Sequence, residues 1–227
     1  MGLPHTSLIL AMSLDGKIAD VQRGAARFSS AADLAHLETR VAAADGVLFG
    51  GGTLRAYGTT LSVRDSTLIA QRQGRHQGDQ PIHIVWSPSG RLDPRSRFFQ
   101  QPVPRGLITT AAGAARWHRG EFGQIWTIPA SQTTPWDWPW TLDQLYQAGI
   151  HTLALLGGGR LAAELLQAER VHEIFITICP LVLGGDTAPT PVEGSGFLVA
   201  LAPRLKLLSN RVVGDEVFLH YQVRYGE

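Results

Sequence analysis

Residues 153–166 read LALLGGGRLAAELL, a short apolar run, three glycines and an arginine, followed by apolar residues at helical spacing. This pattern predicts a strand that turns through Gly157, Gly158 and Gly159 into a helix. The first N–H groups of a helix are unpaired and carry partial positive charge, and glycine lets a large anion approach the backbone. Because Arg160 in that first turn is mildly unfavourable for the helix itself, its presence indicates a phosphate bound beside it.

A second junction of the same kind lies earlier in the chain. Gly50, Gly51 and Gly52 follow the apolar run GVLFG and precede TLRAYG, which predicts a short helix opened by Thr53 and carrying Arg55. Helices that follow parallel strands begin at the same carboxyl edge of a sheet, so two such starts can hold the pyrophosphate of one dinucleotide. Alternatively, the glycines only allow tight turns and close packing, and for either triplet alone the two interpretations are equally supported.

The rest of the chain alternates between apolar runs typical of strands and stretches with helical periodicity. We expect strands over residues 7–12, 46–50, 81–87, 105–110 and 124–129, a helix from Ser30 to Asp45 with Leu34, Leu37 and Val41 on one face, and a helix over 141–149. Two extended runs around Gly214 and Asp215 predict an antiparallel hairpin. The sequence therefore predicts an α/β fold in a single domain, 1–227, with a mostly parallel sheet, helices on both faces and a C-terminal antiparallel hairpin.

Two polar stretches interrupt this pattern. Residues 64–80 are rich in Gln, Arg and Gly and predict a loop that is either mobile or functional. Residues 131–140, SQTTPWDWPW, predict a surface insertion rich in proline and tryptophan.

Composition excludes several classes of protein. The 227 residues are 44% hydrophobic and 17% charged, with a formal net charge of +1, so no global field attracts nucleic acid or an anionic membrane. The single cysteine, Cys179, cannot form an internal disulfide and is expected to be a buried small hydrophobe in a cytoplasmic protein. No apolar stretch reaches the roughly 18 residues of a membrane span, and the N-terminus lacks a signal-peptide pattern.

Common catalytic motifs are missing. The eight histidines form no HExxH motif and no CxxC is present, so we expect no metal site. The GxSxG elbow and the GxxxxGK[ST] phosphate loop are also absent, which removes the patterns that would indicate a hydrolase or a kinase.

Five segments resemble the reductase family of riboflavin biosynthesis, including the C-terminal reductase domain of the bifunctional deaminase-reductase. They are SLDGKIA, VLFGGGTL, LSVR, LLGGGRLAAELL and ICPLVLGGDTAPTPVEG, and the similarity covers nearly the whole chain. The resemblance implies a dihydrofolate reductase-like fold, a homodimer, and an enzyme that uses NADPH to reduce the ribosyl group of 5-amino-6-(5-phosphoribosylamino)uracil to a ribityl chain.

The resemblance also implies site residues, carried over by position. It places against the cofactor Ala11, Gly51, Gly52, Thr53, Gly157, Gly158, Gly159, Arg160 and Leu161, with Ser87 and Arg91 at the adenosine end. Arg64 corresponds to the arginine that holds the substrate phosphate, with Leu61 beside it, and a guanidinium fork suits phosphate. Without the resemblance, a solvated loop arginine is an equally good interpretation of Arg64.

Four positions depart from the family pattern on the substrate side. A lysine of the first strand is replaced by Ile9, a glutamate before the second glycine triplet by Leu156, a tryptophan by Arg27 and an aspartate-rich turn by Tyr57. Apolar groups cannot replace a charge that binds a polar substrate, and a partner left unpaired costs about 1–3 kcal/mol. A second hypothesis is therefore that the protein is a related reductase with a different carbonyl or imine substrate.

The expected chemistry is transfer of a hydride from C4 of NADPH to C1′ of the ring-opened ribosylamine. Asp15 and Lys17 follow the first strand, where they could bind substrate or relay the proton. The alternative is that Asp15 and Gly16 form a turn and Lys17 is solvated. A third hypothesis is a nucleotide-binding protein that binds NADPH and never oxidises it.

Overall fold

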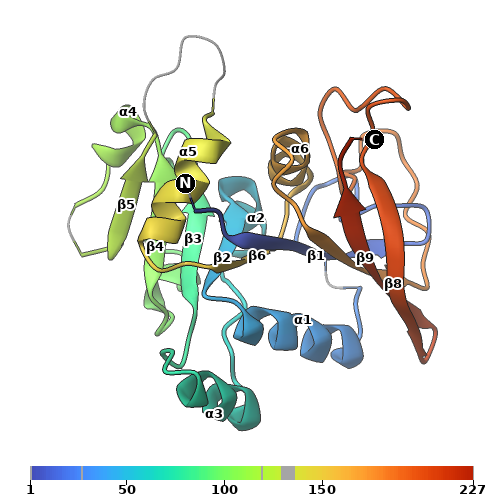
Figure 1. Cartoon of the computed structure of the whole chain (residues 1–227), viewed down its shortest axis with the longest axis horizontal. Coiled ribbons are helices and arrows are strands. Elements are labelled where there is room, and N and C mark those ends of the chain that lie inside the picture. Colours follow the sequence, from blue (N-terminus) through green and yellow to red (C-terminus); the bar gives the residue numbers. More distant parts are fainter. Residues whose placement is uncertain (1, 27, 119, 129–135, 227) are drawn as a thin grey trace. The chain divides into compact units, whose positions relative to one another are not determined.

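The computed structural model describes residues 2–26, 28–118, 120–128 and 136–226 (Figure 1). Its strands are β1 (His5–Ser13), β2 (Gly46–Gly50), β3 (Ile82–Trp86), β4 (Arg105–Thr109), β5 (Gln124–Thr127), β6 (Thr152–Leu155), β7 (Glu173–Cys179), β8 (Arg204–Val213) and β9 (Glu216–Arg224). Its helices are α1 (Ala31–Ala43), α2 (Gly51–Tyr57), α3 (Ser66–Gly74), α4 (Ala111–Ala114), α5 (Trp138–Gln147) and α6 (Gly159–Gln167), with a 3-10 turn at Arg97–Gln100.

Within the described residues, the strands form one nine-stranded sheet in the order β5-β4-β3-β2-β6-β1-β7-β9-β8. The pairs β2–β3, β3–β4, β4–β5 and β1–β7 are parallel. Strand β9 pairs antiparallel with both β7 and β8, and β8 and β9 form the hairpin expected around Gly214 and Asp215. The predicted α/β class, mostly parallel sheet and C-terminal antiparallel hairpin are confirmed.

The chain divides into two compact units. Unit 1 comprises residues 1–5 and 38–154, and unit 2 comprises residues 6–37 and 155–227. Whether both unfold together, as the expected single domain requires, stays a prediction.

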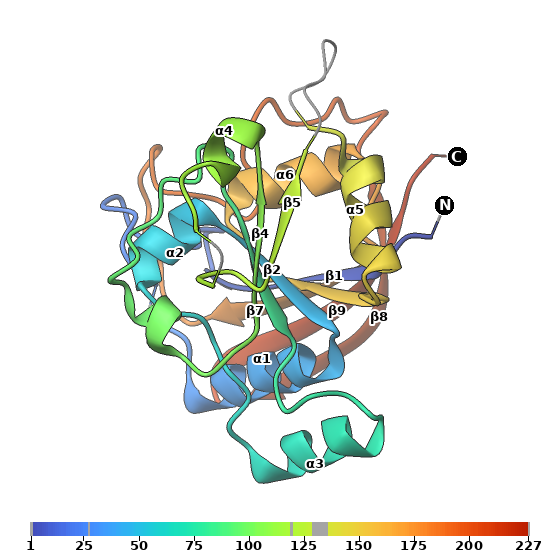
Figure 2. The same cartoon turned by 90° about the vertical axis from the view of Figure 1, so that its left-hand side faces the viewer.

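Unit 1 is built around β2 and β3. All five residues of β2 are buried, and Val47 and Leu48 have no exposed surface. Figure 2 shows α2 and α5 on opposite sides of the strands of this unit. A strand covered on both faces is expected to be apolar at every position, which explains why GVLFG does not alternate.

Unit 2 contains α6 and the C-terminal hairpin, which differ sharply in burial. Helix α6 buries Leu161, Ala162 and Leu165 on one face, as the apolar spacing of LAAELL predicts. In β8, by contrast, all ten residues are exposed.

Two local predictions are wrong. Residues 66–74, expected in a loop, form α3, which begins after Asp65 because its carboxylate accepts hydrogen bonds from the N–H groups of Thr67 and Leu68. Trp138, expected in a surface insertion, is buried in the first turn of α5 beside Trp86; residues 131–135 of that insertion lie outside the described residues. The predicted helix forms as α1, and along its apolar positions Leu34 is half exposed whereas Val41 is fully buried.

Candidate functional site

The glycine junction of unit 2 presents an uncapped helix start. Helix α6 begins at Gly159 after Gly158, whose position carries no side chain to cap the first N–H groups. Gly157 adopts φ +83°, which favours glycine, and a Cβ there would meet nothing within 4 Å. The Gly157–Gly158 peptide bond is cis. The guanidinium of Arg160 is exposed and, among the described residues, has no hydrogen-bond or ion-pair partner, so this helix start can accept an anion.

Gly159 has a different role from Gly157. A Cβ on Gly159 would lie 2.3 Å from the carbonyl oxygen of Thr190 and 2.7 Å from Cγ of Glu193. The absent side chain therefore makes room for residues 190–193. Gly159 is therefore required for close packing. Gly157, by contrast, has open space where a side chain would be.

In the glycine junction of unit 1, too, one glycine is closely packed and another has open space beside it. Helix α2 begins at Gly51 after Gly50, two residues earlier than the predicted start at Thr53. A Cβ on Gly51 would lie 3.2 Å from Cβ and Oγ of Ser87, so these two predicted cofactor residues lie close together. Gly52 is exposed, and a Cβ there would meet nothing closer than the guanidinium of Arg55 at 3.8 Å. A ligand can therefore approach the backbone at Gly52.

A hollow of about 480 Å³ lies just after Ser87 and is lined by Gly90, Arg91, Leu92, Asp93, Pro94, Arg116, Trp117 and Glu121. Sequence reasoning missed Arg116 and Trp117 because the residues around them match no motif. Both Arg91 and Arg116 are exposed, and neither guanidinium has a partner among the described residues.

Each of the two acidic side chains that line this hollow has another contact. Asp93 pairs with Arg95 at 3.3 Å, and the carboxylate of Glu121 accepts a hydrogen bond from the N–H of His118 at 3.0 Å. The two unpaired guanidinium groups therefore leave the hollow suited to an anion.

The wall of the hollow is rigidly held. The indole Nε1–H of Trp117 donates to the carbonyl of Gly90 at 2.8 Å, and its ring stacks on Phe99 at 5.2 Å between centroids. The hydroxyls of Thr109 and Thr110 both donate to the carbonyl of Pro88. A loop fixed in this way adds little backbone ordering cost on binding, although the exposed arginine side chains still lose conformational freedom.

Arg64 lies just before α3, not in a mobile loop. Its backbone N–H and that of Asp65 donate to Oε1 of Glu38, which fixes the chain there. Among the residues that the structure describes, the Arg64 guanidinium has no partner and is exposed, while Leu61 is partly buried. This geometry fits the phosphate contact implied by the resemblance.

Asp15 and Lys17 tether loops in unit 2. The Asp15 carboxylate accepts hydrogen bonds from the Ser13 hydroxyl at 2.6 Å and from the N–H groups of Leu183 and Gly184 at 3.0 and 2.7 Å. The Ser13 hydroxyl and then the Leu183 N–H lower the pKa of Asp15 to about 2. The ammonium of Lys17 lies 3.5 Å from the carbonyl oxygen of Ala188. This geometry favours a structural role for Asp15, and its catalytic role stays a prediction.

The remaining predicted positions vary in accessibility. Leu161 is 1% exposed, so a ligand could reach it only through its backbone. Ile9 is buried in the core, Ala11, Thr53 and Leu156 are partly buried, and Tyr57 is 38% exposed. Arg27 lies outside the described residues. Because Ile9 is packed in the core, it does not offer an accessible apolar surface to a substrate.

A pair of buried carboxyl groups in unit 2 was missed by sequence reasoning. Asp33, in the first turn of α1, is 6% exposed, and burial raises its pKa despite hydrogen bonds with Thr177 and Ser29. Glu216 is 4% exposed and accepts a hydrogen bond from the N–H of Ser30 at 2.8 Å. A carboxyl group with a raised pKa can hold and deliver a proton. The spacing from Ser30 to Asp33, typical of a capped helix start, is the pattern that could have indicated Asp33.

Cys179 behaves as expected from the sequence. Its thiol is fully buried and forms no disulfide, and burial raises its pKa to about 12.

Within the described ranges, no three histidine, cysteine, aspartate or glutamate side chains gather in a way that could hold a metal ion. Among those same residues, none of the helices has the length and apolarity needed to cross a bilayer.

Comparisons with known sequences give consistent matches. Residues 4–219 match the family described as the RibD C-terminal domain. The chain is 28% identical over 222 residues to the 2,5-diamino-6-ribosylamino-4(3H)-pyrimidinone 5′-phosphate reductase of Methanothermobacter thermautotrophicus, covering 97% of this chain and 99% of that protein. It is 29% identical over 222 residues to the riboflavin biosynthesis protein RibD of Escherichia coli, covering 96% of this chain and 60% of that protein.

Comparisons with solved structures give the same fold. A pyrimidine reductase-like protein from Corynebacterium diphtheriae aligns with a TM-score of 0.80 at 20% identity, covering 98% of this chain and 93% of that one. A deaminase/5-amino-6-(5-phosphoribosylamino)uracil reductase from Thermotoga maritima aligns with a TM-score of 0.78 at 19% identity, covering 97% of this chain and 57% of that one. These matches establish the fold predicted from the resemblance.

Proposed function

The chain belongs to the RibD C-terminal domain family of riboflavin-biosynthesis reductases, and from this premise we propose that it is an NADPH-dependent reductase of a phosphorylated ribosylaminopyrimidine. The reaction is addition of a hydride to C1′ of the ring-opened ribosylamine. The names of the relatives specify different pyrimidine substrates. The Methanothermobacter protein is named as a reductase of the 2,5-diamino-pyrimidinone phosphate, and the Thermotoga protein as a reductase of the 5-amino-uracil phosphate. Both are candidate substrates of this chain.

The observation that carries the cofactor proposal is the open helix start of α6. Gly157 leaves space beside the backbone, no side chain caps the first N–H groups, and Arg160 is unpaired among the described residues. These three features suit the diphosphate of a dinucleotide. Within unit 1, the resemblance and the open backbone at Gly52 support Gly52 and Thr53, at the start of α2, as proposed cofactor residues.

The proposal of NADPH over NADH rests on the hollow after Ser87. The two cofactors differ only by the 2′-phosphate of the adenosine, so preference between them requires groups that bind this phosphate. Arg91 and Arg116 are suitable, because both line the hollow and neither is engaged by a described acidic group.

The side chains of the enzyme have binding and orienting roles. Bound NADPH supplies the hydride from C4 of its nicotinamide. Arg64 holds the substrate phosphate, which is far from the reacting carbon in the substrate and therefore helps to orient it. Addition of hydride to C1′ requires one proton at the attached nitrogen. Asp15 and Lys17, in the loop after β1, are proposed to bind the substrate or to relay this proton.

A homodimer is supported by the edge strand β8. Strand β8 ends the strand order, and its exposed large apolar side chains are Leu205, Leu207, Leu208, Val212 and Val213. An exposed apolar edge strand promotes aggregation unless something covers it. We propose that a second copy of the chain covers β8.

We also propose that the enzyme is located in the cytoplasm, where the buried thiol of Cys179 would remain reduced.

The alternative with a specific observation in its favour is a related reductase with another carbonyl or imine substrate. Leu156 replaces a glutamate of the family pattern, and it is not fully buried. A nucleotide-binding protein without catalysis is the remaining alternative.

Titration with NADPH and NADH, followed by turnover assays with each of the two pyrimidine phosphates, tests the proposal. We expect tighter binding of NADPH and loss of its nicotinamide absorbance with at least one of the pyrimidines. Binding of NADPH without turnover of either pyrimidine would favour the alternatives, and a screen of carbonyl and imine acceptors would separate them. Absence of binding to both cofactors would overturn the proposed function.

A further inference from the structure

Residues 190–193 lie against the start of α6, as the contacts of Thr190 and Glu193 with Gly159 show. The N–H of Glu193 donates to the carbonyl of Gly159 at 3.1 Å. A Cβ on Gly159 would lie 2.7 Å from Cγ and 3.3 Å from Cδ of Glu193. The carboxylate carbon of Glu193 therefore lies beside the first residue of α6, at the helix start proposed to bind the cofactor diphosphate.

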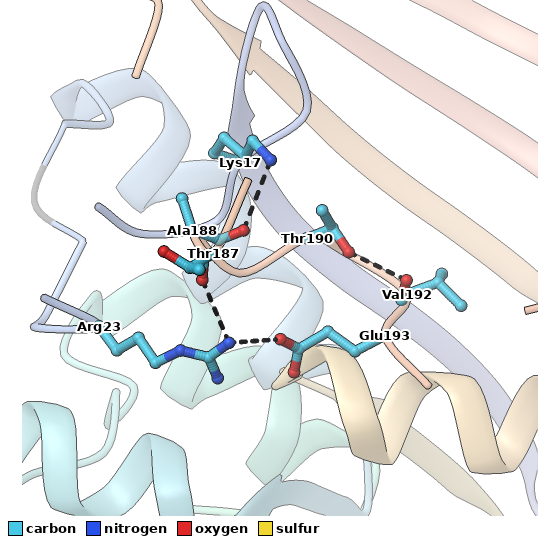
Figure 3. Close-up of polar contacts among 7 residues, drawn as sticks. All are labelled: Lys17, Arg23, Thr187, Ala188, Thr190, Val192 and Glu193. Atoms are coloured by element: carbon cyan, nitrogen blue, oxygen red, sulfur yellow. Dashed lines mark hydrogen bonds and ion pairs between the residues drawn. The ribbon is translucent and has the colours of Figure 1, made fainter. Parts of the chain in front are cut away.

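Arg23 pairs with this carboxylate. One terminal guanidinium nitrogen of Arg23 lies 3.2 Å from Oε1 of Glu193, and the same nitrogen donates to the carbonyl of Thr187 at 3.3 Å (Figure 3). The Glu193 side chain is 19% exposed and that of Arg23 is 54% exposed. The carboxylate of Glu193 is therefore less exposed to solvent and salt than the guanidinium of Arg23. Because it is less screened, removal of the Arg23 charge should have a larger effect on its local electrostatic potential.

Arg23 has an uncommon backbone conformation. Its φ of +57° is uncommon for a residue with a Cβ, and its N–H donates to the carbonyl of Asp20 at 3.0 Å. An unfavourable conformation of this kind persists when surrounding contacts fix it, and it is a reason to look for a role of the side chain.

Two neighbouring contacts hold the same segment. Figure 3 shows Lys17 reaching Ala188, whose carbonyl oxygen lies 3.5 Å from its ammonium. The N–H of Ile18 donates to the carbonyl of Pro189 at 2.9 Å. Because these contacts do not depend on Arg23, loss of its charge should leave the segment in place and change mainly the electrostatics beside α6.

We propose that Arg23 is a positioning residue for cofactor binding. By pairing with Glu193, it neutralises and restrains a carboxylate that would otherwise repel the cofactor diphosphate at the start of α6. Arg23 acts through Glu193 and does not contact the cofactor. The inference rests on the proposed function, because it requires NADPH to bind at this helix start.

A double-mutant cycle tests this role. The variants are Arg23→Gln, Glu193→Gln and both together, with Arg23→Lys as the conservative change and Arg97→Gln as the control. Arg97 is exposed and has no side-chain partner among the described residues, so this control removes one positive charge elsewhere. The measurements are the Kd for NADPH by fluorescence titration at low and high salt, and thermal unfolding without ligand.

We expect Arg23→Gln to raise the Kd for NADPH about five- to tenfold at low salt, and less at high salt. Glu193→Gln should leave the Kd unchanged or lower it. The double variant should return to within about twofold of wild type, because removal of the carboxylate removes the need for its partner. Arg23→Lys should retain most of the affinity, and Arg97→Gln should have little effect.

Two results would overturn the inference while leaving the proposed function intact. One is normal NADPH binding by Arg23→Gln. The other is a double variant as weak as Arg23→Gln, which would indicate that Arg23 contacts the cofactor directly or acts only on the fold. If the wild-type protein does not bind NADPH, the proposed function fails and this inference fails with it.

Discussion

Glu216, at the start of β9, accepts hydrogen bonds from both the backbone N–H and the hydroxyl of Ser30, the residue before α1. The Ser30 hydroxyl in turn accepts hydrogen bonds from the N–H groups of Ala32 and Asp33 at 3.1 and 3.2 Å. Ser30 therefore caps α1 and connects the helix start to the C-terminal hairpin through a carboxylate that is 4% exposed.

Ser30→Ala should lower the free energy of unfolding by about 2–3 kcal/mol. Loss of the cap costs about 1 kcal/mol, and loss of a hydrogen bond to a buried charged group costs about 1.5–3 kcal/mol, with partial overlap between the two. Urea denaturation measures the change. Ser66→Ala is the control, because Ser66 is exposed at the first position of α3 and its side chain has no described partner; it should shift stability by less than about 0.5 kcal/mol. Equal effects of the two changes would contradict the role of Ser30.

Asp15→Asn should make stability less dependent on acidic pH. The Asp15 pKa is about 2 in the folded protein against 3.8 for the ordinary side chain, so the carboxylate stabilises the fold above pH 3.8 and this contribution is lost as pH falls through about 2. The stability difference between wild type and Asp15→Asn should therefore be largest at neutral pH and shrink between about pH 4 and pH 2. Chemical denaturation across this range measures it. The control is Asp215→Asn, in the exposed turn between β8 and β9.

The same variant tests the proposed catalytic role of Asp15. A group with a pKa of about 2 is ionised throughout the neutral range, so it cannot give a titration in the kcat/KM profile near neutral pH. Asp15→Asn should lower turnover without moving any such titration. Disappearance of a neutral-range limb in the variant would instead assign that limb to Asp15.

Gly52→Ala and Gly159→Ala should separate ligand approach from packing. A methyl group at Gly52 meets no described atom closer than 3.8 Å, so stability should stay the same or rise by up to about 1 kcal/mol. The same methyl should raise the Kd for NADPH about tenfold by blocking close approach to the backbone. At Gly159 the methyl would meet the Thr190 carbonyl, and a loss of about 1–3 kcal/mol in stability is expected. Thermal unfolding and titration of both variants give the comparison, and unchanged affinity in Gly52→Ala would remove Gly52 from the cofactor site.

These two glycines illustrate what the sequence could and could not predict. Each follows an apolar run and precedes a helix, so the pattern correctly indicates both strand-to-helix junctions. Gly159 is closely packed because residues 190–193, far away in the chain, lie beside it, whereas no described remote segment lies within 4 Å of a Cβ at Gly52. Local spacing carries no information about those contacts.

The missed elements have the same kind of cause. Strands such as β1 and β2 were predicted because a continuous apolar run requires little context. Helix α3 was missed because its residues are mainly polar and its start depends on the Asp65 cap. Asp33 was missed because its burial arises only when α1 packs near Thr177 of β7. Tertiary packing, not propensity, determines these features.

Arg91→Gln and Arg116→Gln should change cofactor preference. If these residues bind the 2′-phosphate, each change should raise the Kd for NADPH about tenfold, which is the loss expected for one charge-assisted contact, and change the Kd for NADH less than about twofold. Titration with both cofactors measures the preference, with Arg97→Gln as the charge-matched control. Equal losses for NADPH and NADH would contradict the assignment of the hollow to the 2′-phosphate.

Lysine substitutions on β8 should separate the proposed dimer. Leu207 and Val212 are 46% and 67% exposed on a strand that ends the sheet order, and a charge at a paired edge strand must be desolvated when two copies meet. Leu207→Lys with Val212→Lys should halve the mass measured by light scattering at micromolar concentration while leaving far-UV circular dichroism unchanged. Leu34→Lys is the matched control, because Leu34 is 50% exposed on α1 and not on the edge strand, and it should not change the mass. If wild type is already monomeric, or the double variant keeps the dimer mass, a second copy does not cover β8; the exposed apolar strand would then require a different partner.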